Sequence, residues 1–201
     1  MSISAYVISA ICGNWWQEST LNPSIWQGLS QATFTSLNAG YGLGQWTNTG
    51  GDIHGRLYKL YKWITDNGKY IDDGNAQIDY FIEENVWYSR EEASSFSNLS
   101  AFLNSTSTDI EFLTHAFNRG WEGIHDSTWD VRVTYARNCY QYIQEYYNDT
   151  SITEWKKGNR YLSTNERLNN AVMVYRKLNG IVPPTPTKKH KMPLYMMLRQ
   201  Y

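Results

Sequence analysis

The stretch that decides the fold is residues 4–19, which read SAYVISAICGNWWQES. Ile8, Ile11 and Trp15 stand three and four residues apart, and this spacing places them on one face of an α-helix. The serine that opens the stretch is a favourable helix N-cap, and Asn22-Pro23 stops a helix soon after the stretch ends. The pattern predicts an amphipathic helix with a buried face.

Glu18 continues this apolar face three residues after Trp15. Apolar surroundings disfavour a charged carboxylate, and the negative end of the helix dipole acts in the same direction. A carboxyl group that keeps its proton near neutral pH can serve as a general acid. The alternative is an ordinary surface glutamate in the last turn of the helix.

Residues 41–47, YGLGQWT, alternate glycines with bulky side chains. The alternation predicts a glycine-rich strand that a ligand approaches closely, with Tyr41 and Gln45 on one face. Gln45 can then hydrogen-bond a polar ligand, and the aromatic rings of Trp26, Tyr41 and Trp46 can stack on sugars. The alternative is a small hairpin whose aromatic side chains belong to the core.

The remainder of the chain predicts a mainly α fold, a helical bundle with a small glycine-rich β-hairpin beside a substrate groove. Residues 28–51 and 94–108 are rich in Gly, Ser, Thr and Asn and resist a helical interpretation. Apolar periodicity and capping residues predict further helices at 53–65, 76–87, 108–117, 130–147 and 163–179.

Composition restricts the function. Aromatic residues make up 15% of the chain, which is typical of a folded protein. Residues 1–149 hold 8 basic and 17 acidic residues, whereas residues 150–201 hold 10 basic and 2 acidic ones. The acidic body argues against general nucleic-acid binding. The basic end indicates contact with an anionic polymer, a membrane surface or a partner, or merely solvated charge.

The chain divides at changes in composition. Residues 1–150 are expected to form the catalytic domain and residues 151–180 a helical extension. The proline-rich stretch 182–187 predicts an extended linker. Residues 181–201 form a basic tail that is expected to dock on a larger assembly.

Several other classes are disfavoured. No apolar run is long enough to span a membrane, and the N-terminus lacks the basic residues of a signal peptide. Cys12 and Cys139 are interpreted as separate buried thiols, with a single bridge as the alternative. His54, His115 and His125 match no metal or triad pattern, so we expect no metal and no cofactor.

Four short motifs occur in an order that resembles the superfamily of goose-type lysozymes and lytic transglycosylases. They are Glu18-Ser19, Asn22-Pro23, Gly42-Leu43-Gly44-Gln45 and Ala116-Phe117-Asn118-Arg119-Gly120. In that superfamily a catalytic glutamate ends a helix and a Gly-Leu-x-Gln segment follows it.

Further residues make the resemblance closest to phage tail-associated lysozymes. These residues are Gly13-Asn14, Gln45-Trp46-Thr47, Arg56, Trp121-Glu122 and Arg132-x-x-x-Ala136. The resemblance covers residues 4–147, and nothing in residues 150–201 takes part in it. It implies a lysozyme-like α+β fold.

The resemblance also implies site residues. Glu18 would protonate the glycosidic oxygen of peptidoglycan, and Gln45 and Asn118 would contact the glycan or the catalytic water. Phe117 replaces the family's tyrosine, so a hydroxyl group is missing there. The expected catalytic residues are Glu18, Asp52 and Gln45, and the expected substrate-binding residues are Trp26, Tyr41, Trp46, Asn118 and Glu122.

The reaction type is left between two mechanisms. Hydrolysis commonly needs a second carboxylate. Asp52 is one candidate, with a helix N-cap as its alternative role, and Glu122 is the other, with a salt bridge to Arg132 as its alternative role. Without such a carboxylate the enzyme would be a lytic transglycosylase, which closes a 1,6-anhydro ring and needs no attacking water.

The function expected from the sequence is a muramidase that cleaves the MurNAc-GlcNAc strand of bacterial cell walls. We expect it on a phage tail, or released to the wall as an endolysin. A lytic transglycosylase is the first alternative. A non-catalytic wall-binding or structural tail module is the second.

Overall fold

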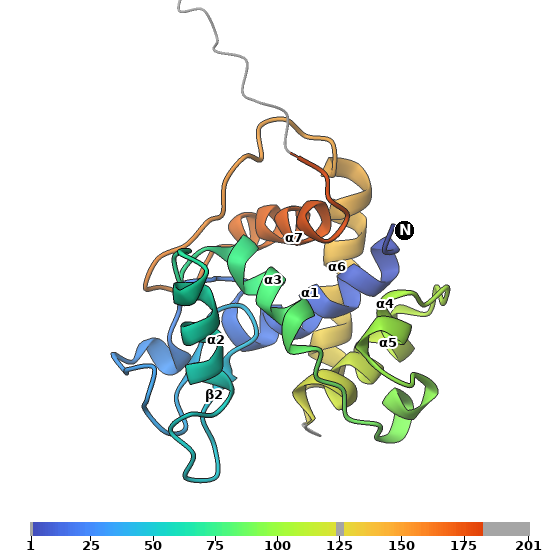
Figure 1. The fold of residues 1–201 in the computed structure, drawn as a ribbon. Helices are drawn as coiled ribbons and strands as arrows, with labels where there is room; N and C mark the ends of the chain where they lie inside the picture. Colours follow the sequence, from blue (N-terminus) through green and yellow to red (C-terminus); the bar gives the residue numbers. More distant parts are fainter. Residues whose placement is uncertain (1, 124–126, 183–201) are drawn as a thin grey trace, which may run out of the picture.

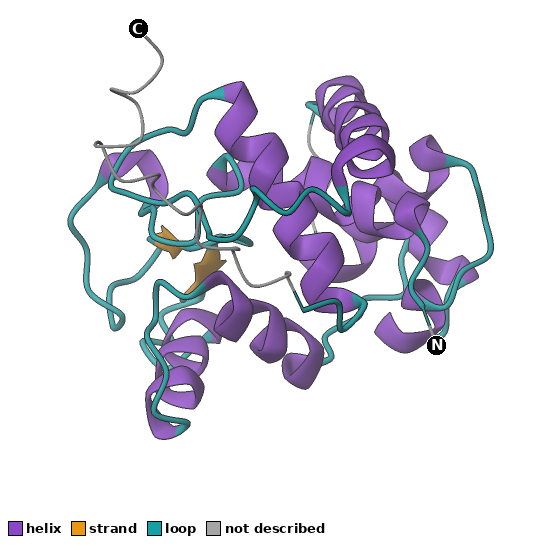
Figure 2. Cartoon of the chain, turned by 90° about the horizontal axis from the view of Figure 1, so that it is seen from above, coloured by secondary structure: helices purple, strands orange, loops and turns teal. Residues whose placement is uncertain are grey.

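The computed structural model describes residues 2–123 and 127–182. In this part of the chain the fold is mainly helical, with one two-stranded antiparallel sheet (Figures 1 and 2). The α-helices are α1 (Ala5–Ser19), α2 (Arg56–Asp66), α3 (Gly74–Glu84), α4 (Leu99–Leu103), α5 (Ile110–Phe117), α6 (Trp129–Tyr146) and α7 (Thr164–Leu178). The shorter elements are strands β1 (Gly40–Tyr41) and β2 (Trp46–Thr47), 3-10 helices at Gln27–Leu29 and Glu91–Ser95, and a π-helix at Asn118–Glu122.

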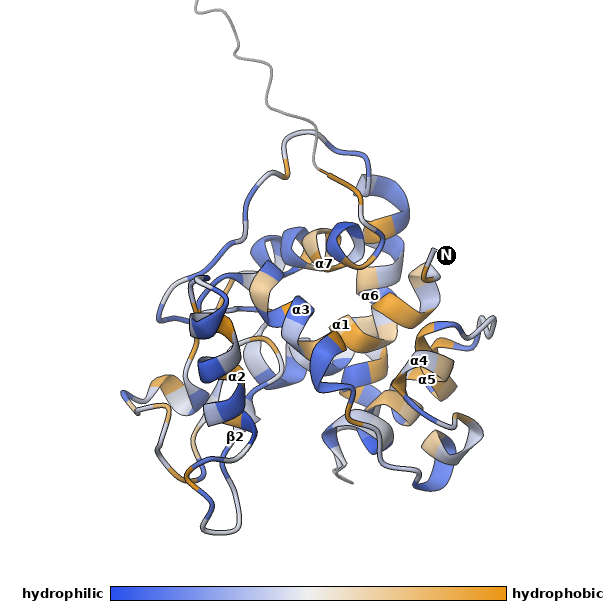
Figure 3. Cartoon of the chain, viewed as in Figure 1, coloured by the Kyte–Doolittle hydropathy of each residue, from blue (hydrophilic) through white to orange (hydrophobic). Residues whose placement is uncertain are grey.

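Helix α1 runs through the middle of the molecule, as the N-terminal sequence predicts (Figure 1). The Ser4 hydroxyl caps it by accepting a hydrogen bond from the Val7 N–H. Thr20, in the left-handed conformation, ends it. Helix α1 packs against α5, α6 and α7. Its N-terminal half is largely hydrophobic (Figure 3), as expected for a helix that is covered by its neighbours.

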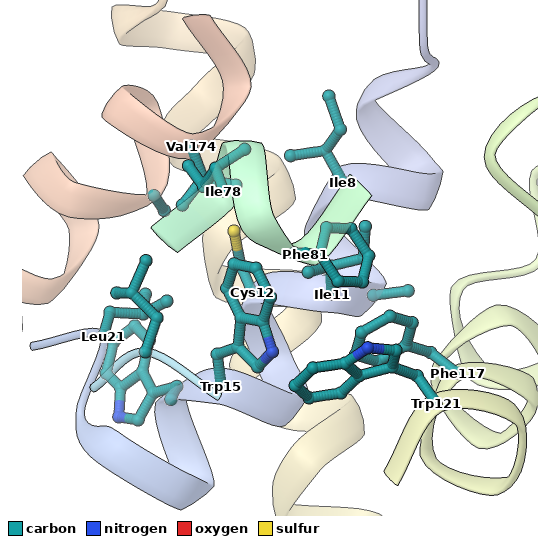
Figure 4. Packing of buried hydrophobic residues seen from close by; sticks show 14 of the residues in the cluster. Ile8, Ile11, Cys12, Trp15, Leu21, Ile78, Phe81, Phe117, Trp121 and Val174 are labelled. Carbon is teal, nitrogen blue, oxygen red and sulfur yellow. The ribbon is translucent and has the colours of Figure 1, made fainter. Parts of the chain in front are cut away.

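The core gathers around the apolar face of α1. Ile8, Ile11 and Trp15 are fully buried, which confirms the predicted face. The Trp15 ring meets Phe81 edge-on at 5.3 Å between centroids, and Trp121 at 5.9 Å (Figure 4). Burying a large apolar side chain stabilises a fold by roughly 1.5–3 kcal/mol, so this cluster is a main source of stability.

Helices α1 and α6 approach closely at Gly13. A Cβ atom there would lie 2.5 Å from the Arg132 carbonyl oxygen and 2.7 Å from the Ala136 Cβ. Cys12 and Cys139 also meet between these helices, as free and buried thiols, so the bridged alternative is wrong. Burial raises the pKa of the Cys12 thiol, and the contact with Cys139 adds to the rise.

Two predicted helices differ at their ends. Helix α2 begins at Arg56 instead of residue 53, because the Asp52 carboxylate accepts the His54 N–H at 2.8 Å and holds a turn. Gly55 is the N-cap, so the proposed capping role of Asp52 for this helix is wrong. Helix α3 ends at Glu84 and not at the predicted residue 87, because the backbone of Asn85 adopts the left-handed conformation.

Residues 40–47 form a hairpin, which confirms the predicted small glycine-rich β-hairpin, whereas residues 41–47 do not form one continuous strand. Gly42 and Gln45 have positive φ angles of 75° and 49°, and they reverse the chain between β1 and β2. A side chain at Gly44 would collide with the Trp121 ring. The glycines therefore allow a tight turn and a close contact with the core.

The C-terminal part joins the same core. Ser163 and Glu166 form the predicted capping box at the start of α7. Val174 of α7 packs in the cluster around α1 (Figure 4). Residues 183–201, which include most of the predicted linker and tail, lie outside the described residues. Among residues 2–123 and 127–182, every helix is too short or too polar to cross a bilayer.

The crossing at Gly13 generates a stability prediction. The Gly13→Ala change gains roughly 1 kcal/mol of helix propensity. Its methyl group, however, has no room against α6. We expect the free energy of unfolding to fall by about 1–2 kcal/mol, as in an overpacked core. Denaturant titration measures it.

Gln17→Ala is the control, because Gln17 is a half-buried residue of the same helix. It should change the free energy of unfolding by less than about 0.5 kcal/mol. A Gly13→Ala protein that is more stable than the parent would contradict the close approach of α1 and α6.

Candidate active site

Glu18 lies in the last turn of α1 and keeps 26% of its side chain exposed. Its Oε1 accepts a hydrogen bond from Arg132 Nη2 at 2.5 Å. The expectation of apolar surroundings is therefore wrong, because α6 places a guanidinium directly against the carboxylate. The position at the edge of the core, on the extension of the apolar face of α1, is as the spacing indicates.

Arg132 links the polar side chains of the site through its guanidinium group. Its side chain is only 2% exposed. Besides Glu18, the guanidinium contacts Glu122 Oε2 through Nη1 at 3.1 Å, and the same nitrogen lies 3.2 Å from Asn14 Oδ1. A buried guanidinium is stable only with such charged and polar partners. This arginine therefore holds groups from α1, α6 and the π-helix in a fixed arrangement.

Glu122 is the second carboxylate of the cluster. It ends the π-helix and has 6% of its side chain exposed. Asn118 Nδ2 donates to Glu122 Oε2 at 2.6 Å. The salt bridge to Arg132, the alternative role predicted for Glu122, is thus present. The structure brings together Glu18, Asn118 and Glu122, and the two carboxylates contact neighbouring nitrogens of one guanidinium.

Asn14 supports this cluster from inside the protein. Its side-chain amide donates to the Ala10 carbonyl at 2.9 Å and to the Thr114 carbonyl of α5 at 3.0 Å. These bonds leave the Asn14 oxygen facing Arg132. The orientation of the guanidinium is therefore coupled to the packing of α1 on α5.

The hairpin is attached to the end of α1 beside Glu18. The Ser19 hydroxyl donates to the Leu43 carbonyl at 2.7 Å. The Leu43 N–H in turn donates to Gln77 of α3 at 2.9 Å. The turn between β1 and β2 is fixed relative to Glu18 by these contacts.

The side chain of Gln45 forms its hydrogen bonds within and beside the hairpin. Its Nε2 donates to the Gly42 carbonyl at 3.0 Å and lies 3.3 Å from the Ile25 carbonyl. Its Oε1 is buried and has no hydrogen-bond partner in the described part of the chain. No hydrogen bond there joins Gln45 to Glu18.

Asp52 does not share hydrogen bonds with the Glu18 cluster among the described residues. It occupies an exposed turn between the hairpin and α2, and its carboxylate accepts the His54 backbone N–H. Across residues 2–123 and 127–182, neither an ion pair nor a hydrogen bond joins it to Glu18 or Arg132.

The three aromatic candidates are placed differently. Trp46 is 1% exposed and donates through Nε1 to Glu84 at 3.1 Å, and Tyr41 is 5% exposed. Both rings are buried in this structure, and their role as stacking platforms stays a prediction. Both belong to the core because the hairpin packs inward. Trp26 is half-buried against Tyr41, with 4.7 Å between centroids.

Arg132 is absent from the site residues that the sequence predicts, where it enters only as part of a motif and as a salt-bridge partner of Glu122. A signal for it exists in the sequence. Arg132, Ala136, Cys139 and Ile143 follow helical spacing and are all buried. The arginine is a charge on an apolar face, the same pattern that singles out Glu18.

Histidines and metals add little to the site. His54 packs against Tyr58 and His115 against Trp129, and His125 lies outside the described residues. Within the described ranges, no three His, Cys, Asp or Glu side chains gather closely enough to hold a metal ion.

A mainly helical domain with a small hairpin beside a helix-ending glutamate defines the lysozyme-like class. The chain belongs to the phage tail lysozyme family, because the model of that family matches residues 1–143. This confirms the resemblance seen in the short motifs. A comparison with curated proteins gave no match. Family membership makes the chain a lysozyme-like cell-wall hydrolase or module, with peptidoglycan as its substrate class.

The buried cluster predicts a large effect of Arg132→Met on stability. The change leaves Glu122 buried beside an apolar side chain. Breaking a buried ion pair in this way costs about 3–5 kcal/mol. We expect a loss of that size in the free energy of unfolding, measured by denaturant titration.

Arg137→Met is the matched control on the same helix, since Arg137 pairs with Glu111 at the surface. It should cost less than about 1 kcal/mol. The double variant Arg132→Met/Glu122→Met should recover part of the loss. Equal effects of the two single variants would show that the Arg132 cluster does not stabilise the fold.

Proposed function

We propose that this protein is a muramidase that hydrolyses the MurNAc-GlcNAc strand of peptidoglycan, with Glu18 as the general acid. The observation that carries the proposal is the cluster of Glu18, Arg132 and Glu122 at the end of α1, beside the hairpin. Family membership supports the substrate class.

Glu18 is suited to proton transfer because it is the more exposed carboxylate of the pair. Glu122 is buried and held by Arg132 and Asn118, whereas Glu18 is the carboxylate that a substrate can reach for proton transfer. Glu122 then acts as a positioning residue.

The second carboxylate of hydrolysis is assigned to Asp52. It is exposed, and its hydrogen bond to the His54 backbone leaves carboxylate lone pairs for a water molecule. Glu122 is less suited because both its ion pair and its burial restrict access by water.

Substrate contacts are assigned to polar acceptors and to one aromatic ring. Gln45 Oε1 and Asn118 Oδ1 are buried oxygens without hydrogen-bond partners among the described residues. A sugar hydroxyl or the catalytic water would satisfy such acceptors. The half-buried Trp26 is the remaining predicted stacking residue.

A lytic transglycosylase is the second candidate. The observation that favours it is the separation of Asp52 from the hydrogen bonds of the Glu18 cluster. An internal ring closure needs a general acid but no carboxylate-activated water.

The family description supports a place on a phage tail, from which the enzyme would reach the cell wall. The basic, proline-rich residues 181–201 would attach it to the larger assembly.

Glu18→Gln should abolish clearing of purified cell walls. The amide keeps the shape of the side chain but cannot donate an acidic proton, and loss of a general acid costs about 10²–10⁴-fold in rate. Turbidity measures the rate. Asp52→Asn should also reduce the rate of clearing, because the proposed mechanism assigns activation of the water molecule to Asp52.

Glu111→Gln is the control, because Glu111 is an exposed glutamate paired with Arg137. It should clear walls at the parent rate. Thermal unfolding checks that all variants are folded. Clearing by Glu18→Gln at the parent rate would show that another residue is the general acid. Absence of clearing by the parent protein itself would instead identify a wall-binding or structural module.

The products distinguish the two mechanisms. Hydrolysis should release muropeptides with reducing muramic acid ends, since water attacks the anomeric carbon. Mass spectrometry of digested walls measures these ends. A predominance of 1,6-anhydro ends would instead identify a lytic transglycosylase and overturn the assignment of Asp52.

A further inference from the structure

We propose that a pocket between α2 and α3 is a second peptidoglycan-binding site, which holds a sugar ring together with a nearby carboxylate of the attached peptide. The pocket has a volume of about 410 Å³. It is lined by His54, Tyr58, Lys59, Lys62, Trp63, Asp66 and Tyr80. None of these residues belongs to the cluster around Glu18. His54 does border the turn of Asp52, because its backbone N–H donates to the Asp52 carboxylate at 2.8 Å.

Aromatic rings form the walls of this pocket. The Trp63 and Tyr80 rings lie 5.8 Å apart between centroids and are tilted by 54°. Tyr58 is held by an edge contact with His54 at 4.6 Å. Tyr58 and Trp63 are each half-buried, so part of each ring faces the solvent. Rings of this kind present an apolar face and a polar edge, which suits a sugar with apolar C–H faces and hydroxyl groups.

The rim of the pocket is positively charged. The acidic region 1–149 contains three lysines, and all of them lie here. Lys59 and Lys62 line the pocket, and Lys69 Nζ lies 5.3 Å from the centre of the Trp63 ring. In Figure 3, α2 carries broad hydrophilic bands. Such a concentration of cations in an acidic body favours an anionic ligand group.

Lys59 is the cation best placed for that group. Lys62 is paired with Asp66 at 2.7 Å, and Lys69 with Asp79 at 2.8 Å. Lys59 is exposed and forms no ion pair with any described residue. It can therefore neutralise a ligand carboxylate without breaking an internal contact.

Peptidoglycan combines both features, because its sugar rings carry short peptides with free carboxylates. The choice of this polymer rests on the proposed function. Most residues that line the pocket belong to α2, whereas Glu18 and Arg132 belong to α1 and α6. Figure 1 shows the positions of these three helices. Two separate contacts with one polymer raise the retention of the enzyme on the wall without a change at the reacting bond.

The test is retention on insoluble peptidoglycan from which phosphate polymers have been removed by hydrofluoric acid. Glu18→Gln serves as the parent, so the polymer stays intact and the readout does not depend on cleavage. Adding Tyr58→Ala should weaken binding roughly five-fold through loss of the ring. Adding Lys59→Glu should weaken it about three-fold, with the difference reduced at high salt.

Arg137→Glu in the same parent is the control, since Arg137 is an exposed cation on α6. It should bind like the parent. Thermal unfolding reports whether the packing of Tyr58 against its neighbours is lost, and Lys59→Glu tests the site without that risk.

Two results would overturn the proposal. The first is retention of Tyr58→Ala and Lys59→Glu equal to that of the parent. The second is weaker binding only on walls that keep their phosphate polymers, which would identify a phosphate polymer as the ligand. Failure of either kind leaves the cleavage assigned to Glu18 intact, since wall clearing by the otherwise unchanged protein tests that separately.

Discussion

The buried guanidinium of Arg132 is the constraint on which the site depends. A charge with 2% of its side chain exposed is costly unless several partners neutralise it. Glu18 and Glu122 supply the opposite charge, and Asn14 supplies a further acceptor. Because these partners come from different elements, the arginine fixes α1, α6 and the π-helix relative to one another while it holds Glu18 in place.

The aromatic excess has a mainly structural explanation. Trp15, Trp46 and Trp121 are buried together, with centroid distances of 5.4–6.3 Å. The hairpin packs on this cluster, because the absence of a side chain at Gly44 lets the turn lie directly against the Trp121 ring. The partly exposed rings to which a ligand contact is assigned are Trp26, beside the hairpin, and Tyr58 and Trp63, on α2. Most of the aromatic residues near the site therefore position the backbone, and only a few are available to a ligand.

The sequence predicts those features that depend on local spacing. Helix α1, the capping box at Ser163 and the position of Glu18 at the end of an apolar face all follow from periodicity or capping chemistry. The small hairpin is also predicted, but the position of its turn is not, because a positive φ at Gln45 cannot be read from alternation. The ion pair of Glu18 joins residues 114 positions apart, and no local pattern encodes such a contact.

The paired thiols have a practical consequence for work on this protein. Cys12 and Cys139 are both fully buried, and burial raises the pKa of the Cys12 thiol. A thiol reacts as its thiolate and must be reached by the reagent, so Cys12 and Cys139 are shielded in the folded state. A cysteine introduced at an exposed position would then be the preferred site for a fluorophore or spin label. The protein without an added cysteine can serve as the background in single-molecule studies of its movement on a cell wall.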